Sequence, residues 1–355
     1  MRDRPRLRAF GALCQARFRE FYRESEVVFW SFIFPIILSF SLGLAFRNRP
    51  AEVLSAAVVE GPGAAEVAAR LKEAPGLRIA VLSEGEASRA LTMGKVEVVV
   101  VAGPAPLTPG AGGLEYRLDP SRPEAAVARA RVDDALQRAA GRRDPLASLD
   151  RPVLEPGGRY IDFLIPGIMG MNLMSGGMWG VGFNLVDMRI KKLLKRLTAT
   201  PMHRADFMAA QMAVRVVFMA LEVSFLLAFG RLAFGVPLRG SVAAVLAVGT
   251  VGALAFGGIG LLVASRARRI ETVTGLMNVI MMPMFICSGI FFSPDRFPDA
   301  LQPVIRALPL TALNDALRAV ILEGASLPSQ GVRLLILAAW GGLSFAAGLR
   351  FFRWN

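Results

Sequence analysis

The sequence has few of the side chains on which enzyme and metal sites are usually built. Its 355 residues include one histidine, His203, and two cysteines, Cys14 and Cys287. Cys14 lies in a basic N-terminal segment and Cys287 in an apolar run. This arrangement predicts neither a disulfide framework nor a Cys-x-x-Cys metal site. His203 lies beside Pro201 and Arg204 and is interpreted as an exposed residue rather than a ligand or a base.

A phosphate-binding loop is also missing. No stretch of the sequence matches Gly-x-x-x-x-Gly-Lys-Ser/Thr, the pattern whose backbone amides hold nucleotide phosphates. We therefore expect that the chain does not hydrolyse ATP, binds no cofactor or metal, and is not an enzyme with catalytic residues of its own.

Apolar residues are abundant instead. They make up 54% of the sequence, the mean hydropathy is +0.48, and they are gathered in long runs. A helix needs about 20 mostly apolar residues to cross a bilayer core of roughly 30 Å. The sequence predicts a polytopic α-helical membrane protein with six transmembrane helices. These are expected at residues 27–46, 161–185, 207–229, 242–264, 273–292 and 334–349.

Positive charge predicts the orientation of these spans. The net charge is +13, and much of the excess lies in short segments beside apolar runs. Such charge is typical of cytoplasmic loops and of contact with anionic lipids, so no nucleic-acid partner is expected. Residues 1–26 are interpreted as a cytoplasmic interfacial helix that stays attached, since no A-x-A cleavage site follows the first apolar run. Both termini are predicted to be cytoplasmic.

Residues 47–159 have a different character, with both signs of charge and frequent proline and glycine. Short apolar runs alternate with helical patterns, which predicts a small α/β domain inserted between the first and second spans, outside the cytoplasm. Within residues 160–355, the polar and proline-rich stretch 295–330 is too polar for a full span. It is predicted to form extracytoplasmic re-entrant or interfacial helices.

A basic segment, residues 189–205, separates the second and third predicted spans. Ile190, Leu193, Leu194 and Leu197 recur at the spacing of one helical stripe, and basic residues occupy the other faces. This pattern predicts a short amphipathic helix that lies at headgroup level on the cytoplasmic side. Thr200-Pro201 is typical of the start of the next helix.

The third predicted span contains two ionisable residues, Arg215 and Glu222. They lie on the same helical face, about 10.5 Å apart along the axis. Ionisable groups at such depth usually face protein or a wet cavity. Two interpretations stay open: a polar lining of a transport path, or a structural charge pair that fixes helix packing.

Two stretches carry a family resemblance. They are KRLTATPMHRADF at residues 195–207 and SGIFFSPDRFPDALQPVIRALPLTALNDALRAV at residues 288–320. Together with one span, a large external domain and five further spans, they resemble the permease subunits of type-two ABC exporters. This class includes bacterial drug, lipid and polysaccharide exporters.

The resemblance implies a permease of the bacterial inner membrane that works with two copies of a separate ATPase subunit, which would hold ATP and Mg²⁺. It also implies a second permease, in the simplest case an identical copy, and an apolar or amphipathic substrate such as a drug, a lipid or a lipid-linked molecule. The residues that would couple the permease to the ATPase are Arg189, Lys191, Lys192, Leu193, Leu194 and Arg196.

Two other hypotheses are kept. One is a secondary transporter that uses Arg215 and Glu222 for ion coupling. The other is a membrane-anchored assembly or binding protein whose external domain does the work. The density of glycine and the intramembrane charges argue against a passive anchor.

Overall fold

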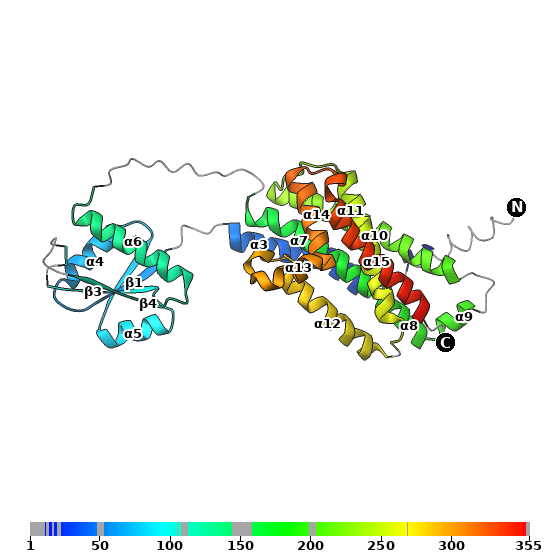
Figure 1. Ribbon diagram of the computed structural model, residues 1–355, viewed down its shortest axis with the longest axis horizontal. Helices are drawn as coiled ribbons and strands as arrows, with labels where there is room; N and C mark the ends of the chain where they lie inside the picture. Colours follow the sequence, from blue (N-terminus) through cyan, green and yellow to red (C-terminus); the bar gives the residue numbers. More distant parts are fainter. Residues whose placement is uncertain are drawn as a thin grey trace. The chain divides into compact units, whose positions relative to one another are not determined.

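The computed structural model describes residues 23–47, 53–104, 106–107, 113–143, 158–198, 204–267 and 269–352, together with residues 11, 14, 15, 18 and 19. The chain divides into two compact units. One, the helical unit, comprises Met1–Arg47 and Leu154–Asn355, and the other, the α/β unit, comprises Asn48–Val153. Figure 1 follows both along the chain, from blue at the N-terminus to red at the C-terminus. Most of the predicted N-terminal helix, 1–26, lies outside the described residues.

The α/β unit contains a four-stranded sheet with strand order β2-β1-β3-β4. β1 pairs in parallel with both β2 and β3, and β3 pairs antiparallel with β4. In this register Val58 lies beside Val81 on one side and Val100 on the other. The elements are β1 Leu54–Val59, α4 Ala64–Glu73, β2 Leu77–Leu82, α5 Glu84–Thr92, β3 Val98–Ala102, β4 Leu114–Leu118 and α6 Pro123–Ala139.

Helices cover both faces of this sheet. Val58 packs in one buried cluster with Val67 and Leu71 of α4, and α6 contributes to the same cluster. Ala57, the preceding residue of β1, packs in a second cluster with Ala87 of α5. Successive strand residues point to opposite faces, so a continuous apolar strand can fill two cores.

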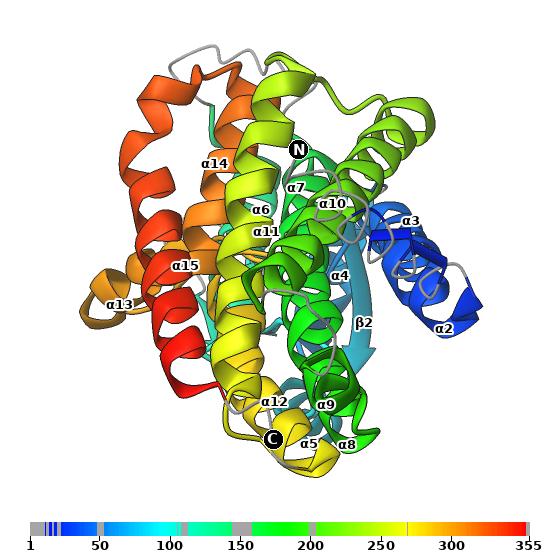
Figure 2. The same cartoon turned by 90° about the vertical axis from the view of Figure 1, so that its right-hand side faces the viewer.

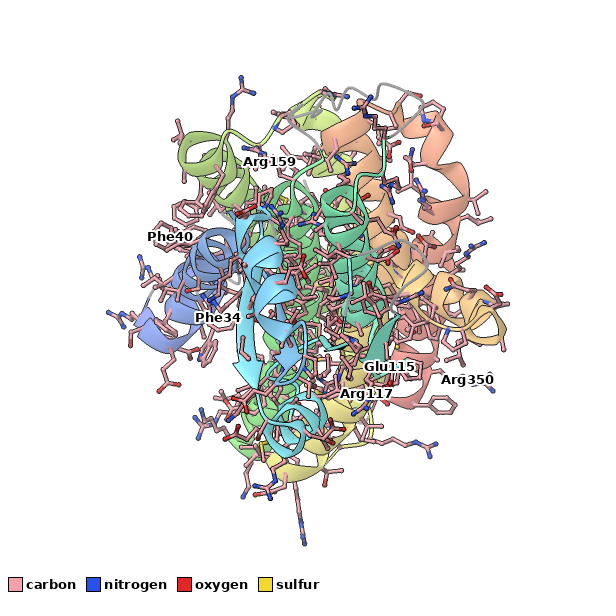
Figure 3. The ribbon with its side chains drawn as sticks, turned by 90° about the vertical axis from the view of Figure 1, so that its left-hand side faces the viewer. Phe34, Phe40, Glu115, Arg117, Arg159 and Arg350 are labelled. Carbon is pink, nitrogen blue, oxygen red and sulfur yellow. The ribbon has the colours of Figure 1, made fainter. Side chains whose placement is uncertain are left out.

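Polar contacts fix the start of α5 and connect it to β4. Ser83 and Glu86 form a capping box, in which the Ser83 backbone amide donates to Glu86 at 3.2 Å. Arg117 of β4 donates to Glu115 beside it at 2.8 Å, and the two side chains are labelled in Figure 3. Arg117 also donates to Glu84 in the first turn of α5. The side of the membrane on which this unit lies stays a prediction.

The helical unit consists of long helices and several short ones. Those of the N-terminal half are α2 Ser25–Val28, the π-helix η1 Phe29–Ile33, α3 Phe34–Arg47, α7 Tyr160–Gly177, the π-helix η2 Met178–Phe183, α8 Asn184–Ile190, α9 Leu193–Thr198 and α10 Arg204–Phe234. Those that follow are α11 Val242–Ala264, α12 Ile270–Cys287, η3 Pro294–Arg296, η4 Asp299–Leu301, α13 Gln302–Ala307, α14 Pro309–Glu323, η5 Leu327–Gln330 and α15 Gly331–Phe351.

Five helical stretches among the described residues are long and apolar enough to cross a membrane. They are Ser25–Ala45, Asp206–Phe234, Val242–Ala264, Ile270–Cys287 and Pro328–Phe351. They correspond to the first, third, fourth, fifth and sixth predicted spans. The chain is therefore a multi-pass helical membrane protein, and the count of six spans stays a prediction.

The second predicted span, residues 161–185, falls in α7, η2 and α8, outside that set of five. Buried polar residues such as Asp162 and Asn172 lower its mean hydropathy. α7 can carry such residues because other helices surround it: it contacts α3, α10, α11 and α14. In Figure 2, α7 and α11 run through the middle of the helical unit, between α14 and α15 on one side and α3 on the other. A helix enclosed by protein does not need a surface that suits lipid.

The stretch predicted as re-entrant or interfacial forms the short helices η3, η4 and α13, followed by α14. α14 begins with Pro309 at its first position and ends at Glu323. Its C-cap is Gly324, whose φ of +71° is the left-handed conformation common at helix C-termini. It packs against α7, α11 and α15. The predicted fifth span, 273–292, is too long: α12 ends at Cys287, and the chain turns at Gly289, with φ +72°.

Candidate functional site

The basic segment between the second and third predicted spans contains a turn between α8 and α9, instead of the single helix that its pattern predicts over residues 189–197. α8 ends at Ile190, and the amides of Lys191 and Lys192 donate to the carbonyl oxygens of Asp187 and Arg189 at 2.9 and 3.0 Å. Lys192 has φ +57°, the one positive value at a non-glycine residue in the described part of the chain. The continuous helix over 189–197 was therefore a wrong prediction, because the left-handed residue stops α8 before α9 begins.

The left-handed conformation at Lys192 costs about 1 to 2 kcal/mol for a residue with a Cβ. Neighbouring contacts hold the turn in spite of this cost. Lys191 forms an ion pair with Asp187, with 2.8 Å between Nζ and Oδ2. Leu194, directly after the turn, is 1% exposed and belongs to the core of the helical unit.

The structure divides the six residues predicted to contact a partner into three groups. Lys191, Lys192, Leu193 and Arg196 are exposed. Leu194 is buried and anchors the turn. Arg189 is half-buried, and its side chain extends into the helical unit. The basic turn, defined here as residues 187–196, thus has an exposed basic surface and an anchored underside.

Arg189 joins the basic turn to the ends of two other helices. Its Nη1 donates to the carbonyl oxygens of Ala264 at 2.9 Å and Ala267 at 2.6 Å, at the C-terminal end of α11. A cation at this end of a helix also interacts favourably with the helix dipole. The guanidinium lies over the ring of Phe352, just after α15, at 4.8 Å from its centroid. A displacement of the turn would therefore act directly on α11 and α15.

The two ionisable residues of α10, Arg215 and Glu222, meet each other in the structure. Both bonds of the bidentate pair, Nη1 to Oε1 and Nη2 to Oε2, measure 3.0 Å. The side chains are 6% and 2% exposed. Removing one partner of such a buried pair leaves an uncompensated charge, and this makes the pair costly to break.

The same pair connects α10 to α7. Arg215 Nη2 lies 3.5 Å from the carbonyl oxygen of Leu173. Gly176 lies directly under the guanidinium, and a methyl group there would overlap it. Each carboxylate oxygen already accepts from the guanidinium, so the pair is closed between the two side chains. This geometry favours the structural interpretation over a lining of a transport path.

Polar residues of α14 make contacts that the sequence analysis did not anticipate. Asn314 donates to the carbonyl oxygen of Ser288, and Arg318 donates to that of Gly289. The Arg318 guanidinium also lies over the ring of Phe163 in α7, at 3.6 Å from the centroid. Ser288 and Gly289 belong to the SGIFF stretch, and Asn314 and Arg318 to the NDALR stretch. Two parts of the second resemblance stretch, residues 288–320, are therefore in direct contact.

The chain matches known proteins over most of its length. Residues 26–350 match a family model whose description is ABC-2 family transporter protein. The chain is 26% identical over 189 residues to ABC transporter G family member 20 of Dictyostelium discoideum, an alignment that covers 52% of the chain and 26% of that protein.

Two bacterial permeases are similar to about half of the chain. It is 26% identical over 176 residues to the linearmycin resistance permease protein LnrN of Bacillus subtilis, covering 50% of the chain and 46% of that protein. It is 24% identical over 191 residues to the probable multidrug ABC transporter permease YbhR of Escherichia coli, covering 53% of the chain and 52% of that protein. The aligned part thus spans about a quarter to about half of the length of these three relatives.

Proposed function

Because the chain belongs to the ABC-2 family of transporter proteins, we propose that it is the transmembrane permease subunit of an ATP-driven exporter. The observation that carries this proposal is the family match over residues 26–350, which includes nearly all of the membrane-type helices. Membership in an ABC permease family implies association with an ATPase subunit. Two of the similar proteins are named for multidrug transport and linearmycin resistance, and this supports an apolar or amphipathic substrate moved out of the cytoplasm or inner leaflet.

The assembly that fits this function contains two permeases and two ATPase subunits in a bacterial inner membrane. The second permease is a further copy of this chain, and ATP and Mg²⁺ are held by the ATPase subunits. The termini and the basic turn face the cytoplasm, which agrees with the positive charge of the turn.

The basic turn is the surface on which the ATPase docks. Lys191, Lys192, Leu193 and Arg196 are exposed there, and they offer an apolar contact surrounded by cations. Closure of the ATPase subunits on ATP would move the turn as a unit, because Leu194 anchors it in the core. Arg189 then passes the displacement to α11 and α15 through its bonds to Ala264 and Ala267.

The test is purification of the tagged full-length chain from its native host in mild detergent. A nucleotide-binding subunit is expected to co-purify and to hydrolyse ATP. The double variant K191E/K192E should lose most of this subunit, since the charge of the docking surface is reversed. The matched control is K72E/K95E, which reverses two exposed lysines of the α/β unit.

Two results would count against the proposal, and they can be distinguished. If no ATPase co-purifies with the unmodified chain, the exporter function itself is contradicted. If the ATPase co-purifies equally well with K191E/K192E, the function stands and the docking surface lies elsewhere.

A second candidate function is secondary transport with Arg215 and Glu222 as the ion-coupling pair. The observation in its favour is the burial of both charges within α10. The closed bidentate geometry supports the exporter instead, because no oxygen of the Glu222 carboxylate is left without a guanidinium donor. Transport into proteoliposomes that depends on an ion gradient and not on ATP would favour the second candidate.

A further inference from the structure

A cavity lies in the helical unit at the C-terminal end of α10. Its volume is about 290 Å³, and α7, α10, the loop between α10 and α11, α11 and α14 contribute to its wall. This volume is at the lower limit of the range for sites that hold a whole small molecule, roughly 300 to 1,000 Å³. The cavity therefore suits a segment of an apolar chain better than a complete drug-sized ligand.

Two small residues on the outer face of α10, Ser224 and Ala228, line this cavity. Arg231 follows them at the i, i+4, i+7 spacing of one helical face, and all three residues are exposed. Their neighbours Phe225 and Leu232 are large exposed apolar residues. Where Ser224 and Ala228 replace such bulk, the surface is hollowed between α10 and its neighbours. The cavity is consequently open along the face of α10.

The floor and the wall of the cavity are fixed by packing and by backbone hydrogen bonds. Ile165 of α7 and Ile321 of α14 line it and are fully buried. In the loop after α10, the amide of Val236 donates to Gly230 at 3.1 Å, and the amide of Arg239 donates to Ile321 at 2.9 Å. The cavity is therefore preformed and does not require a rearrangement of the loop.

One charge stands at the edge of this apolar wall. Of the described residues that line the cavity, Arg231 alone is charged. Its guanidinium has no hydrogen-bond or ion-pair partner in the part of the chain that the structure describes. An unpartnered cation beside an apolar cavity is complementary to a molecule with an anionic head and an apolar chain.

The depth of the site in the membrane-type helix identifies that molecule. Arg231 lies three residues before the end of α10, in the last turn of a candidate span of 29 residues, where a headgroup region is expected. Ser224 lies seven residues earlier, about 10.5 Å along the helix toward its middle. The charge and the apolar wall are thus arranged like the phosphate and the first part of an acyl chain. We infer that this cavity binds one acyl chain of an anionic phospholipid, with the lipid phosphate on Arg231.

This inference does not depend on the proposed function, and its test needs no ATPase. The purified full-length chain is titrated with dioleoyl phosphatidylglycerol or dioleoyl phosphatidylcholine, and bound lipid is counted by native mass spectrometry. The two lipids have identical chains, so their difference reports the headgroup alone. One phosphatidylglycerol should bind about five-fold more tightly than phosphatidylcholine, which is the contribution of one arginine near a membrane surface.

Two variants test separately how the headgroup and the acyl chain contribute to the affinity for the lipid. R231Q should lower the affinity for phosphatidylglycerol to that for phosphatidylcholine, because the cation is removed. A228F should weaken the binding of both lipids, because the ring fills the cavity. The controls are R306Q, an exposed arginine that does not line the cavity, and L232F, a bulky substitution at a fully exposed position of the same helix. Both controls should bind as the unmodified chain does.

Three results would overturn the inference. Equal affinity of the unmodified chain for the two lipids would show that the net negative charge of the headgroup does not decide binding, and the preference for an anionic phospholipid would be wrong. Unchanged phosphatidylglycerol binding in R231Q would show that another cation holds the phosphate. Unchanged binding in A228F, while L232F behaves normally, would show that no chain enters the cavity.

Discussion

The side-chain amide of Asn314 donates a hydrogen bond to the carbonyl oxygen of Ser288, with 2.8 Å between the two atoms. This bond ties α14 to the turn that ends α12, and both residues are fully buried. The other side-chain atom, Oδ1, lies against Gly170 of α7, where a methyl group would overlap it. Asn314 is thus the point at which three elements of the helical unit meet.

Replacing Asn314 by leucine should destabilise the helical unit. The Ser288 carbonyl oxygen would lose its donor in a buried site, at a cost of about 1 to 3 kcal/mol. The temperature at which half of the detergent-purified protein stays monodisperse should fall by several degrees. S326A removes an exposed hydroxyl group that makes no capping hydrogen bond, and it should leave that temperature unchanged. A leucine variant as stable as the unmodified chain would show that the bond between α14 and α12 contributes nothing.

Exchanging both members of the buried pair in α10 should be tolerated far better than exchanging one. R215M alone leaves Glu222 without its cation and should cost about 3 to 5 kcal/mol. The double variant R215M/E222L replaces both charges by apolar side chains, and it should recover most of that stability. The measurement is thermal unfolding of the single and double variants in detergent.

Export by the double variant decides between the two interpretations of this pair. If the pair only fixes the packing of α10 on α7, the stable double variant exports normally. A double variant that is stable but does not export would assign the pair to the transport path. We expect the first result, because Nη1 and Nη2 of Arg215 pair with both carboxylate oxygens of Glu222, and only the Arg215 Nε donor of this pair is left without a partner among the described residues.

R189A should uncouple ATP hydrolysis from export without releasing the ATPase. The exposed residues of the basic turn stay in place in this variant, whereas the bonds to Ala264 and Ala267 are lost. Coupling energies between sites are typically about 1 to 3 kcal/mol, so export per ATP hydrolysed should fall about five-fold or more. R266A removes a cation over the ring of Phe351 and serves as the matched control. Loss of ATPase binding in R189A would instead show that Arg189 belongs to the docking surface.

Residues 48–153 should fold alone, because the sheet packs against helices on both faces within this stretch. Their stability should depend on pH in two ranges. Hydrogen bonds from Ser83 lower the pKa of Glu86, and those from Ser121 lower the pKa of Asp119. Each lowered pKa contributes to the stability of the fold. This contribution is complete above the pKa of the unfolded chain, about 4, and is lost as the pH falls through the lower pKa of the folded state.

In the alkaline range, the pH dependence of the stability of residues 48–153 comes from Tyr116. Burial, and then its hydrogen bond to Asp133, raise the pKa of this phenol. A raised pKa stabilises the fold below the unfolded value of about 10, and this stabilisation is lost as the pH rises above it. Chemical unfolding between pH 3 and pH 11 should therefore show a loss at both ends. E86Q should weaken the acid dependence and Y116F should remove the alkaline one; unchanged profiles would contradict both assignments.

Hydrophobic pattern predicted those features of the fold that depend on neighbours in sequence. Within residues 47–159 the sequence predicts short strands that alternate with helices, and the structure has β1 to β4 and α4 to α6 there. The end of α8 could not be predicted in this way. No glycine, proline or asparagine marks it, and the left-handed residue is Lys192.

Contacts between distant residues decided the rest of the site. Arg189 has the same local signature as Lys191, yet its acceptors lie 75 and 78 residues further along the chain. Charge spacing predicted that Arg215 and Glu222 share a face, whereas the role of Gly176 depends on the packing of α7 against α10. The cavity beside Arg231 likewise needs a floor from α7 and α14, which no local pattern of α10 encodes.

The π-helical segment η2 lies within one uninterrupted rod that runs from Tyr160 to Ile190. A π-turn inserts an additional residue into an α-helix. At 3.6 residues per turn, one residue corresponds to a rotation of about 100°. The side chains after η2 are therefore out of phase with those before it. The two ends of this rod present differently oriented faces to their neighbours, and a helical wheel drawn continuously across Met178–Phe183 assigns one end to the wrong face.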